Sequence, residues 1–246
     1  MNKLWALLLL AATLPAGAAD LTVSAASSLT ESFREISSAY EKANPGTKVD
    51  LNFAASGTLL QQIARGAPVD VLASADQATM AQATTEGLID PATQHVFAQN
   101  SLWVVVPPQA SNKPTTLAAL ARADVKRVAI GNPDSVPVGR YARGALQQAG
   151  VWPAVQAKMI STQNVRQSLD YVARGEVDAG FVYATDAQAM SERVQRAFQV
   201  PVAGEISYPL AMVKTSRNAA EAKRFIAFVR SAQGQAILHR HGFGSP

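Results

Sequence analysis

Ala25-Ala26-Ser27-Ser28-Leu29-Thr30 stands where a short apolar run ends and a helical pattern begins, and later stretches repeat this arrangement. The run from Leu21 to Ala25 predicts a strand, and the two serines lead it directly into a helix. Ser28 and Glu31 fit a capping box, in which a serine opens the helix and a glutamate three residues later reaches back. Such a helix start presents free backbone N–H groups and the positive end of the helix dipole, which favour an anion. An ordinary capped helix has the same pattern, so the interpretation depends on matching stretches elsewhere.

The order of strand, small polar turn and helix recurs through the chain. Lys48 to Ala54 predicts a second strand, which leads through Ala55-Ser56-Gly57-Thr58 into another helix. Strands that alternate with helices at this spacing predict an α/β fold with parallel sheets covered by helices. Ligands on such sheets lie beyond the carboxyl ends of the strands, near helix N-termini. This rule places five residues at candidate cleft positions: Ser28, Ser56, Val138, Val165 and Tyr183.

Pro107-Pro108, with the polar segment as far as Pro114, is the clearest break in composition. One α/β series precedes this break and a second series follows it. We therefore expect two lobes with a cleft between them, and a crossing of the chain near the prolines.

The N-terminus has the pattern of a secretory signal peptide. Lys3 supplies a positive charge, Leu4 to Leu14 an apolar core, and Ala16-Gly17-Ala18 a cleavage site with small residues. The apolar core is too short for an ordinary membrane-spanning helix, so we expect residues 1–18 to be removed and the mature chain to be soluble in a bacterial periplasm, without insertion into a membrane. The absence of cysteine excludes disulfides and a lipid anchor on an N-terminal cysteine. A net charge of +4 from scattered Lys and Arg, together with export, argues against nucleic acid as a partner.

Residues that support enzymatic or metal chemistry are sparse. His239 and His241 lie close together near the C-terminus but lack a third ligand, and His95 stands alone, so no metal site is expected. Neither a nucleophile elbow nor a phosphate-binding glycine loop is present in the sequence. Ser28 and Ser56 have no histidine nearby in sequence to serve as a base, although partners of a serine nucleophile can be distant.

Four aspartates lie at the edges of expected strands or turns. Helix caps and hydrogen bonds between lobes are the favoured interpretation, and paired carboxylates for acid–base chemistry are the alternative. Tyr183 ends an expected strand at the level of the cleft, where its hydroxyl either donates to a ligand or is the wet tip of a core tyrosine. The aspartates are Asp70, Asp76, Asp178 and Asp186.

Several short motifs, in one order from Asp20 to Phe243, resemble the periplasmic molybdate-binding proteins of ABC uptake systems. The resemblance covers essentially the mature chain. The motifs are Ala25 to Thr30, Phe53 to Leu59, Gly66 to Val71, Ser74 to Asp76, Asn100 to Leu102, Val136 to Ala142, Asn164 to Arg166 and Val182 to Ala187.

This resemblance implies a type II periplasmic binding-protein fold, in which each lobe is a mostly parallel sheet flanked by helices. The first lobe would contain residues 19–103 and 209–246, and the second residues 104–208. The protein would bind one tetrahedral oxyanion, molybdate or tungstate, between the lobes and deliver it to an inner-membrane ABC permease. It would act as a monomer, without enzymatic activity, a cofactor or a free metal cation.

The resemblance also assigns roles to the five cleft residues. Ser28 and Ser56 would donate hydroxyl and backbone N–H groups, and we expect the Ser28 hydroxyl to turn toward the ligand. Val138 and Val165 would donate backbone N–H groups, and Tyr183 its hydroxyl. The family often has alanine at the position of Val138 and serine at that of Gly57, and neither departure removes a backbone donor.

A pocket made only of donors suits a fully deprotonated dianion, because hydrogen phosphate carries a proton that needs an acceptor. Sulfate has the right charge but is smaller, so only the size of the pocket can reject it. Two alternatives follow: a binding protein for sulfate or another tetrahedral oxyanion, and a secreted serine hydrolase that uses Ser28 or Ser56.

Overall fold

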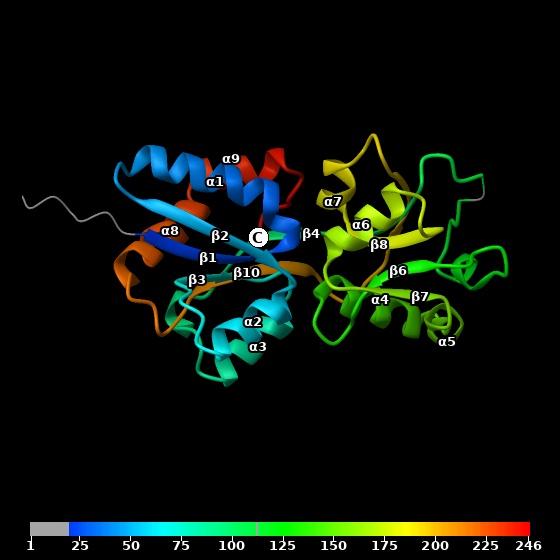
Figure 1. Cartoon of the computed structure of the whole chain (residues 1–246), viewed down its shortest axis with the longest axis horizontal. Helices are drawn as coiled ribbons and strands as arrows, with labels where there is room; N and C mark the ends of the chain where they lie inside the picture. The colour runs from blue at the N-terminus through cyan, green and yellow to red at the C-terminus, as the bar shows by residue number, and fades with distance from the viewer. Residues whose placement is uncertain (1–19, 112) are drawn as a thin grey trace, which may run out of the picture.

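The computed structural model describes residues 20–111 and 113–246, which form two lobes side by side along the long axis of the molecule (Figure 1). Each lobe contains one five-stranded sheet flanked by helices. The expected signal peptide, residues 1–18, lies outside the described residues. Within the described part of the chain, no helix combines the length and the apolar character needed to cross a membrane.

The sheet of the first lobe has the strand order β2-β1-β3-β10-β4. Its strands are β1 (Asp20–Ala26), β2 (Lys48–Ala54), β3 (Val71–Ala73), β4 (His95–Asn100) and β10 (Ile206–Met212). The helices and 3-10 turns of this lobe are η1 (Ser27–Leu29), α1 (Thr30–Ala43), α2 (Ser56–Ala64), α3 (Gln77–Thr85), η2 (Pro91–Thr93), α8 (Ala219–Arg230) and α9 (Ala232–Arg240).

The sheet of the second lobe has the order β7-β6-β8-β5-β9. Its strands are β5 (Leu102–Val106), β6 (Val128–Gly131), β7 (Met159–Thr162), β8 (Ala179–Tyr183) and β9 (Gln195–Val200). Its helices and 3-10 turn are η3 (Ala118–Ala121), α4 (Pro137–Gln148), α5 (Trp152–Gln156), α6 (Val165–Ala173) and α7 (Ala184–Ala189).

The two sheets share one topology. In each, three strands are parallel (β2-β1-β3 and β7-β6-β8), and the fourth strand, β10 or β5, runs antiparallel to both of its neighbours. The α/β repeat in the sequence predicts the parallel part. The antiparallel part comes from the strands that enter from the other lobe, which the alternation of strands and helices does not reveal.

The chain changes sheet twice, between Asn100 and Leu102 and between Val200 and Ile206. The lobe boundaries expected from the sequence, after residues 103 and 208, fall inside β5 and β10. The composition break at Pro107-Pro108 lies after β5, in a loop that follows the crossing. At the first changeover, only Ser101 separates β4 from the apolar β5, so the sequence carries no break there, whereas Pro201 and Gly204 do mark the second.

Helix α4 packs closely on the end of β6, and a glycine makes this possible. A Cβ atom at Gly139 would lie 1.9 Å from the carbonyl oxygen of Gly131, so a larger residue would push the helix away. The close packing brings the N-terminus of α4 to the carboxyl end of β6, where the second lobe faces the first.

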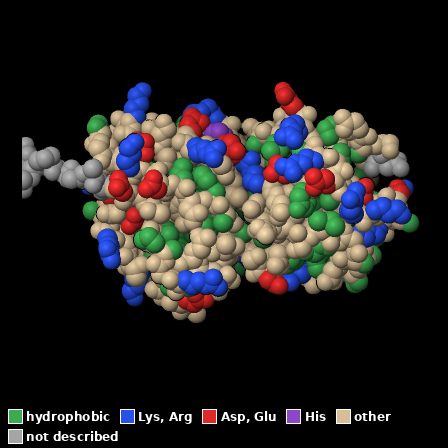
Figure 2. Space-filling view, viewed as in Figure 1, with side chains coloured by type: hydrophobic (Ala, Val, Ile, Leu, Met, Phe, Trp, Pro, Cys, Tyr) green, Lys and Arg blue, Asp and Glu red, His purple; other side chains and the backbone are tan. Residues whose placement is uncertain are grey.

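The core continues from one lobe to the other through two buried tyrosines. The rings of Tyr183 on β8 and Tyr208 on β10 meet edge to face, with centroids 5.7 Å apart. Tyr208 also packs against Phe97 and Phe243 of the first lobe. On the face shown in Figure 2, Lys and Arg side chains are spread over both lobes among acidic ones, as their scatter in the sequence predicts.

Candidate functional site

A small cavity lies between the lobes, at the carboxyl ends of parallel strands from both sheets. The centre of a water-sized sphere has about 10 Å³ in which to move, which is about the room of one water molecule. A sugar, an amino acid or a peptide needs far more room. The cavity is lined by Ala26, Ser27, Ser28, Ala54, Ala55, Ser56, Ala75, Val136, Pro137, Val138, Val165 and Tyr183, which include all five residues expected from the sequence.

Three helices begin at this cavity. Ser56 and Val165 are the first residues of α2 and α6, and Val138 is the second residue of α4. Backbone N–H groups in the first turn of a helix have no partner within that helix. The cap of α6 is the Asn164 side chain, which accepts from the N–H of Gln167 and not from that of Val165. The helices therefore direct donors and the positive ends of three dipoles toward one point.

Ser56 adds a hydroxyl whose orientation is constrained. Its Oγ accepts a hydrogen bond from the backbone N–H of Ala75 at 3.0 Å. This bond occupies a lone pair, so the proton of the Ser56 hydroxyl remains available for a ligand. Ser56 is fully buried, as expected for a group that works away from bulk water.

The capping box expected at Ser28 and Glu31 is wrong. A 3-10 turn, Ser27–Leu29, precedes α1, and the Ser28 Oγ lies 3.0 Å from the hydroxyl oxygen of Tyr208. Glu31 forms an ion pair with Arg166 of the second lobe. The Glu31–Arg166 ion pair and the Ser28–Tyr208 contact therefore replace the expected cap. Ser28 lies at the cavity wall.

Among the described residues 20–111 and 113–246, Tyr183 contributes the one cavity hydroxyl that is fully buried and has no hydrogen-bond partner. The residue is 1% exposed, so this hydroxyl has lost its hydration without protein compensation. Burial raises the pKa of Tyr183 well above its ordinary value of 10.0, and the nearby Tyr208 adds to this effect. The group is therefore a neutral donor at physiological pH, and its residue lines a cavity whose other walls carry further donors.

Two salt bridges between the lobes flank the cavity. Arg140 on α4 lies 2.7 Å from Asp76 at the start of α3, and Arg166 on α6 pairs with Glu31 on α1. A third contact is the hydrogen bond from the N–H of Gly57 to the carbonyl of Ser135 at 3.1 Å. A Cβ at Gly57 would lie 2.6 Å from that carbonyl oxygen, so the glycine permits this close approach of the lobes.

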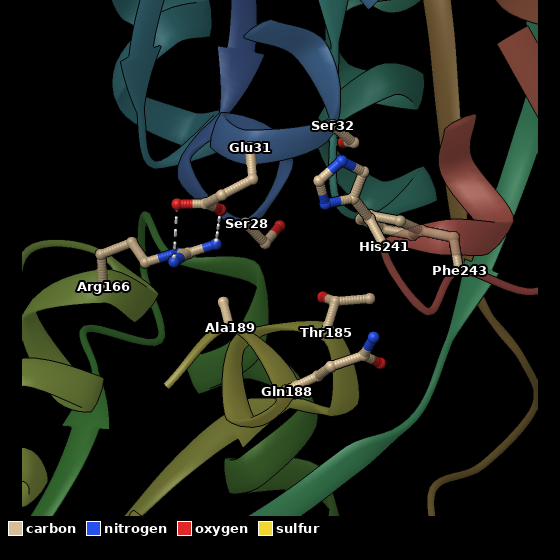
Figure 3. A pocket seen from close by; sticks show the side chains of 9 residues that line it. All are labelled: Ser28, Glu31, Ser32, Arg166, Thr185, Gln188, Ala189, His241 and Phe243. Carbon is tan, nitrogen blue, oxygen red and sulfur yellow. Dashed lines mark hydrogen bonds and ion pairs between the residues drawn. The ribbon is translucent and has the colours of Figure 1, made fainter. Parts of the chain in front are cut away.

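Figure 3 shows a larger pocket beside the cavity, which we call the outer pocket. Ser28 lines both spaces, and the Arg166–Glu31 pair crosses from lobe to lobe at the edge of the outer pocket. The outer pocket is lined by Ser28, Glu31, Ser32, Arg166, Thr185, Gln188, Ala189, His241 and Phe243.

The four aspartates accept hydrogen bonds from backbone N–H groups, but only Asp76 and Asp186 do so at the start of a helix, while Asp70 and Asp178 bind backbone within their own lobes. Asp76 caps α3 through the N–H of Thr79 at 3.1 Å, and Asp186 accepts from the N–H of Tyr183 at 3.1 Å. Asp70 accepts from the N–H of Thr22, and Asp178 from those of Lys126 and Arg127.

Asp186 has one cationic neighbour besides its backbone donor. Arg166 Nε lies 3.0 Å from its Oδ1, although the angles do not suit a hydrogen bond. Burial raises the pKa of Asp186 to about 6 against the opposing effect of Arg166.

The histidines do not form a metal site. His241 bonds Glu35 at 2.8 Å and His239 bonds Ser245 at 3.2 Å. In the described ranges, no three side chains of His, Cys, Asp or Glu group in a way that would hold a metal ion.

Sequence reasoning missed three residues around the cavity. Tyr208 lies in an uninterrupted buried strand and is indistinguishable there from a core residue. Arg140 and Arg166 pair with carboxylates far away in the sequence, which no local pattern reveals. Both arginines do lie in the first turns of the helices that face the cavity, and that position was the available signal.

Comparisons with known proteins agree with this geometry. The model of the family of bacterial extracellular solute-binding proteins matches residues 21–244. The molybdate-binding protein ModA of Escherichia coli K12 is 36% identical over 228 residues, which cover 91% of this chain and 88% of that protein.

Two solved structures also resemble the chain. The substrate-binding domain of a putative molybdenum ABC transporter from Clostridium difficile is 31% identical with a TM-score of 0.69, and the match covers 92% of this chain and 99% of that one. The periplasmic molybdate-binding protein of Azotobacter vinelandii is 23% identical with a TM-score of 0.80, over 92% and 99% of the two chains. This second likeness supports the fold.

The serine hydrolase alternative has no support in these findings. The hydrogen-bonding neighbours of Ser28 and Ser56 in the described chain are Tyr208 and the N–H of Ala75, and neither can act as a general base for a serine. The relatives are solute-binding proteins of transporters and not enzymes. The chain belongs to the family of bacterial extracellular solute-binding proteins.

Proposed function

We propose that this protein captures molybdate, and also tungstate, as a dianion in the cavity between its lobes and delivers it to an ABC permease. The observation that carries this proposal is the buried Tyr183 hydroxyl, which has no protein partner in the described chain and lines the same cavity as three helix N-termini. A donor in such a position is costly unless a ligand accepts from it. The ModA relatives support molybdate as that ligand.

The cavity wall contains neither a Lys nor an Arg. A dianion can still bind there, because charge-assisted hydrogen bonds from neutral donors add to about half a positive charge at each helix N-terminus. Arg140 and Arg166 stand just behind the wall, but each is already neutralised by a carboxylate of the first lobe. The charge of the ion is therefore balanced by dipoles, and the arginines connect the lobes.

The preference for anions without a proton follows from the hydrogen-bond donors that line the cavity. Ser56 and Tyr183 offer protons, and the backbone groups at Val138 and Val165 offer N–H. An anion that keeps a proton would place it against another donor, an arrangement that costs about 1–3 kcal/mol when buried. Sulfate avoids this penalty, so the proposal requires that its smaller size costs it contacts with one of the lobes.

The remaining expectations belong to the same proposal. The lobes close on the ion by a hinge at the two crossings between the sheets. Export through the segment Met1 to Ala18, a periplasmic location, action as a monomer and the absence of a cofactor stay predictions.

Titration calorimetry of the mature protein with molybdate, tungstate, sulfate and phosphate tests the proposal. We expect one site per chain with tight binding of molybdate and tungstate, weaker binding of sulfate, and the weakest binding of phosphate. Tight sulfate binding with weak molybdate binding would reassign the protein to another oxyanion. A chain that binds none of the four would overturn the proposal as a whole.

A further inference from the structure

A chain of hydrogen bonds leads from the crossing between the lobes to the cavity. Asn100, the last residue of β4, directs its Nδ2 toward the Tyr208 hydroxyl at 3.3 Å, and Tyr208 contacts the Ser28 Oγ at 3.0 Å. Tyr208 and Ser28 are buried. Neither Asn100 nor Tyr208 lines the cavity, so their hydrogen bonds reach a ligand through Ser28. The other route, the ring contact of Tyr208 with Tyr183, does not involve the Tyr208 hydroxyl.

The orientation of the Asn100 amide is fixed by its surroundings. Its Oδ1 accepts from the backbone N–H of Ser101 at 2.9 Å, which identifies the other branch as the NH₂ group. That group has two protons and two acceptors in reach, the hydroxyl oxygens of Thr185 at 3.0 Å and of Tyr208. Asn100 is therefore a donor to Tyr208.

The direction of the remaining bonds follows from this donor. A phenol that accepts from Asn100 still has its own proton, and burial raises the pKa of Tyr208 well above its ordinary value, so the proton stays on the oxygen. Ser28 is the neighbour that can accept this proton. Once the Ser28 Oγ accepts from Tyr208, its own proton points away from Tyr208, and the cavity, with its place for an anion, is one of the two spaces that Ser28 lines.

From this geometry we propose that Tyr208, held by Asn100, is a positioning residue that fixes the Ser28 hydroxyl as a donor and thereby sets the preference of the site for anions without a proton. The inference rests on the proposed function and deepens it. Ser56 follows the same principle with a different upstream donor, the N–H of Ala75. In both serines the bond from the upstream donor occupies one lone pair and leaves the hydroxyl proton free to point at an anion.

The variant Tyr208→Phe tests this proposal, because it removes the donor to Ser28 and preserves the ring. Without that donor, the Ser28 hydroxyl is free to rotate and to accept. Calorimetry at about pH 8 compares molybdate with phosphate, which is there a dianion with one proton. We expect the dissociation constant for molybdate to rise about tenfold while that for phosphate does not rise, so the preference for molybdate falls about tenfold.

Asn100→Asp is the second variant, and it reverses the donor direction of the hydrogen bonds from residue 100 to Ser28. An aspartate accepts from Tyr208, which then must accept from Ser28, and the lone pairs of Ser28 face the ion. The added negative charge weakens both dianions alike, so their ratio isolates the change in polarity. We expect the molybdate-to-phosphate preference to fall at least as far as in Tyr208→Phe.

Tyr40→Phe is the matched control. Tyr40 is another buried tyrosine of the first lobe, and its hydroxyl bonds Glu221. Its loss should leave the preference unchanged. The proposal is overturned if folded Tyr208→Phe keeps a preference within about threefold of the wild type; if that variant does not fold, Asn100→Asp decides by the same criterion. A wild type that binds no molybdate would contradict the proposed function instead.

Discussion

Replacing Tyr183 by phenylalanine separates the binding role of its hydroxyl from its packing role. The ring stays against Tyr208, and only the hydroxyl that lacks a partner in the described chain is removed. For most buried tyrosines, such a change costs stability because a hydrogen bond is lost. Tyr183 has no such bond to lose, so the change should weaken ligand binding without lowering the stability of the ligand-free protein.

The variant should bind molybdate more weakly, whereas its free energy of unfolding without ligand should stay the same or rise. A hydrogen bond to a charged group contributes about 1.5–3 kcal/mol, which corresponds to a dissociation constant for molybdate that is about ten to 150 times higher. The free energy of unfolding without ligand should not fall, and it should rise by up to about 1 kcal/mol, because a buried polar group without a partner is removed.

Calorimetry with molybdate and urea unfolding of the ligand-free protein measure the two effects. Tyr40→Phe is the control with the reverse expectation, since its hydroxyl bonds the buried Glu221: stability should fall by about 1–3 kcal/mol and molybdate affinity should not change. Unchanged affinity of Tyr183→Phe, or a loss of more than about 1 kcal/mol in its ligand-free stability, would refute the reasoning.

Three further predictions concern the backbone donors, the contacts between lobes and pH. Val138→Ala should keep molybdate affinity within about threefold because its N–H survives, and Val138→Pro, which lacks that N–H, should bind at least about tenfold more weakly; equal binding would remove this donor from the site. Arg140→Gln should weaken binding about tenfold without touching the ion, because Asp76 loses its cation when the lobes meet, and calorimetry that finds wild-type affinity would contradict this. Burial raises the pKa of Asp186 from 3.8 to about 6, so the folded state binds this proton more tightly than the unfolded state, and stability falls as pH rises through that window. Urea unfolding between about pH 4 and pH 7 should show that the wild type loses roughly 2 kcal/mol relative to Asp186→Asn, and parallel profiles would exclude the shift.

Much of the fold is predictable because its signals are local. The strand from Lys48 to Ala54 has the predicted bounds, and Gly46, Gly66 and Gly87 end the helices and turns at which their positive φ is needed. The crossings between the sheets were harder to place. Strand β4 ends at Asn100 and β5 begins at Leu102, and the joint between them has neither a proline nor a change in composition.

In the candidate site, too, local patterns predict some features and miss others. Helix starts and strand ends predict that Ser28, Ser56, Val138, Val165 and Tyr183 share one cavity, and the structure brings them together, while their role as ligands stays a prediction. The pairing of Glu31 with Arg166 spans 135 positions in sequence, and the local template of a capping box led to the wrong partner. Hydrophobic periodicity and local motifs carry no information on tertiary contacts of this kind.

The crossing strands also determine the order in which the two sheets can fold. Every strand of the second sheet comes from one continuous segment, residues 102–200, whereas the first sheet needs β10 from near the other end of the chain. A chain that emerges from its N-terminus can therefore finish the second sheet while the first still lacks its fourth strand. Contacts between residues so far apart close late, because the intervening loop must lose its freedom first. Tyr208 arrives on that last strand, so the donor that orients Ser28 is set in place only when folding ends.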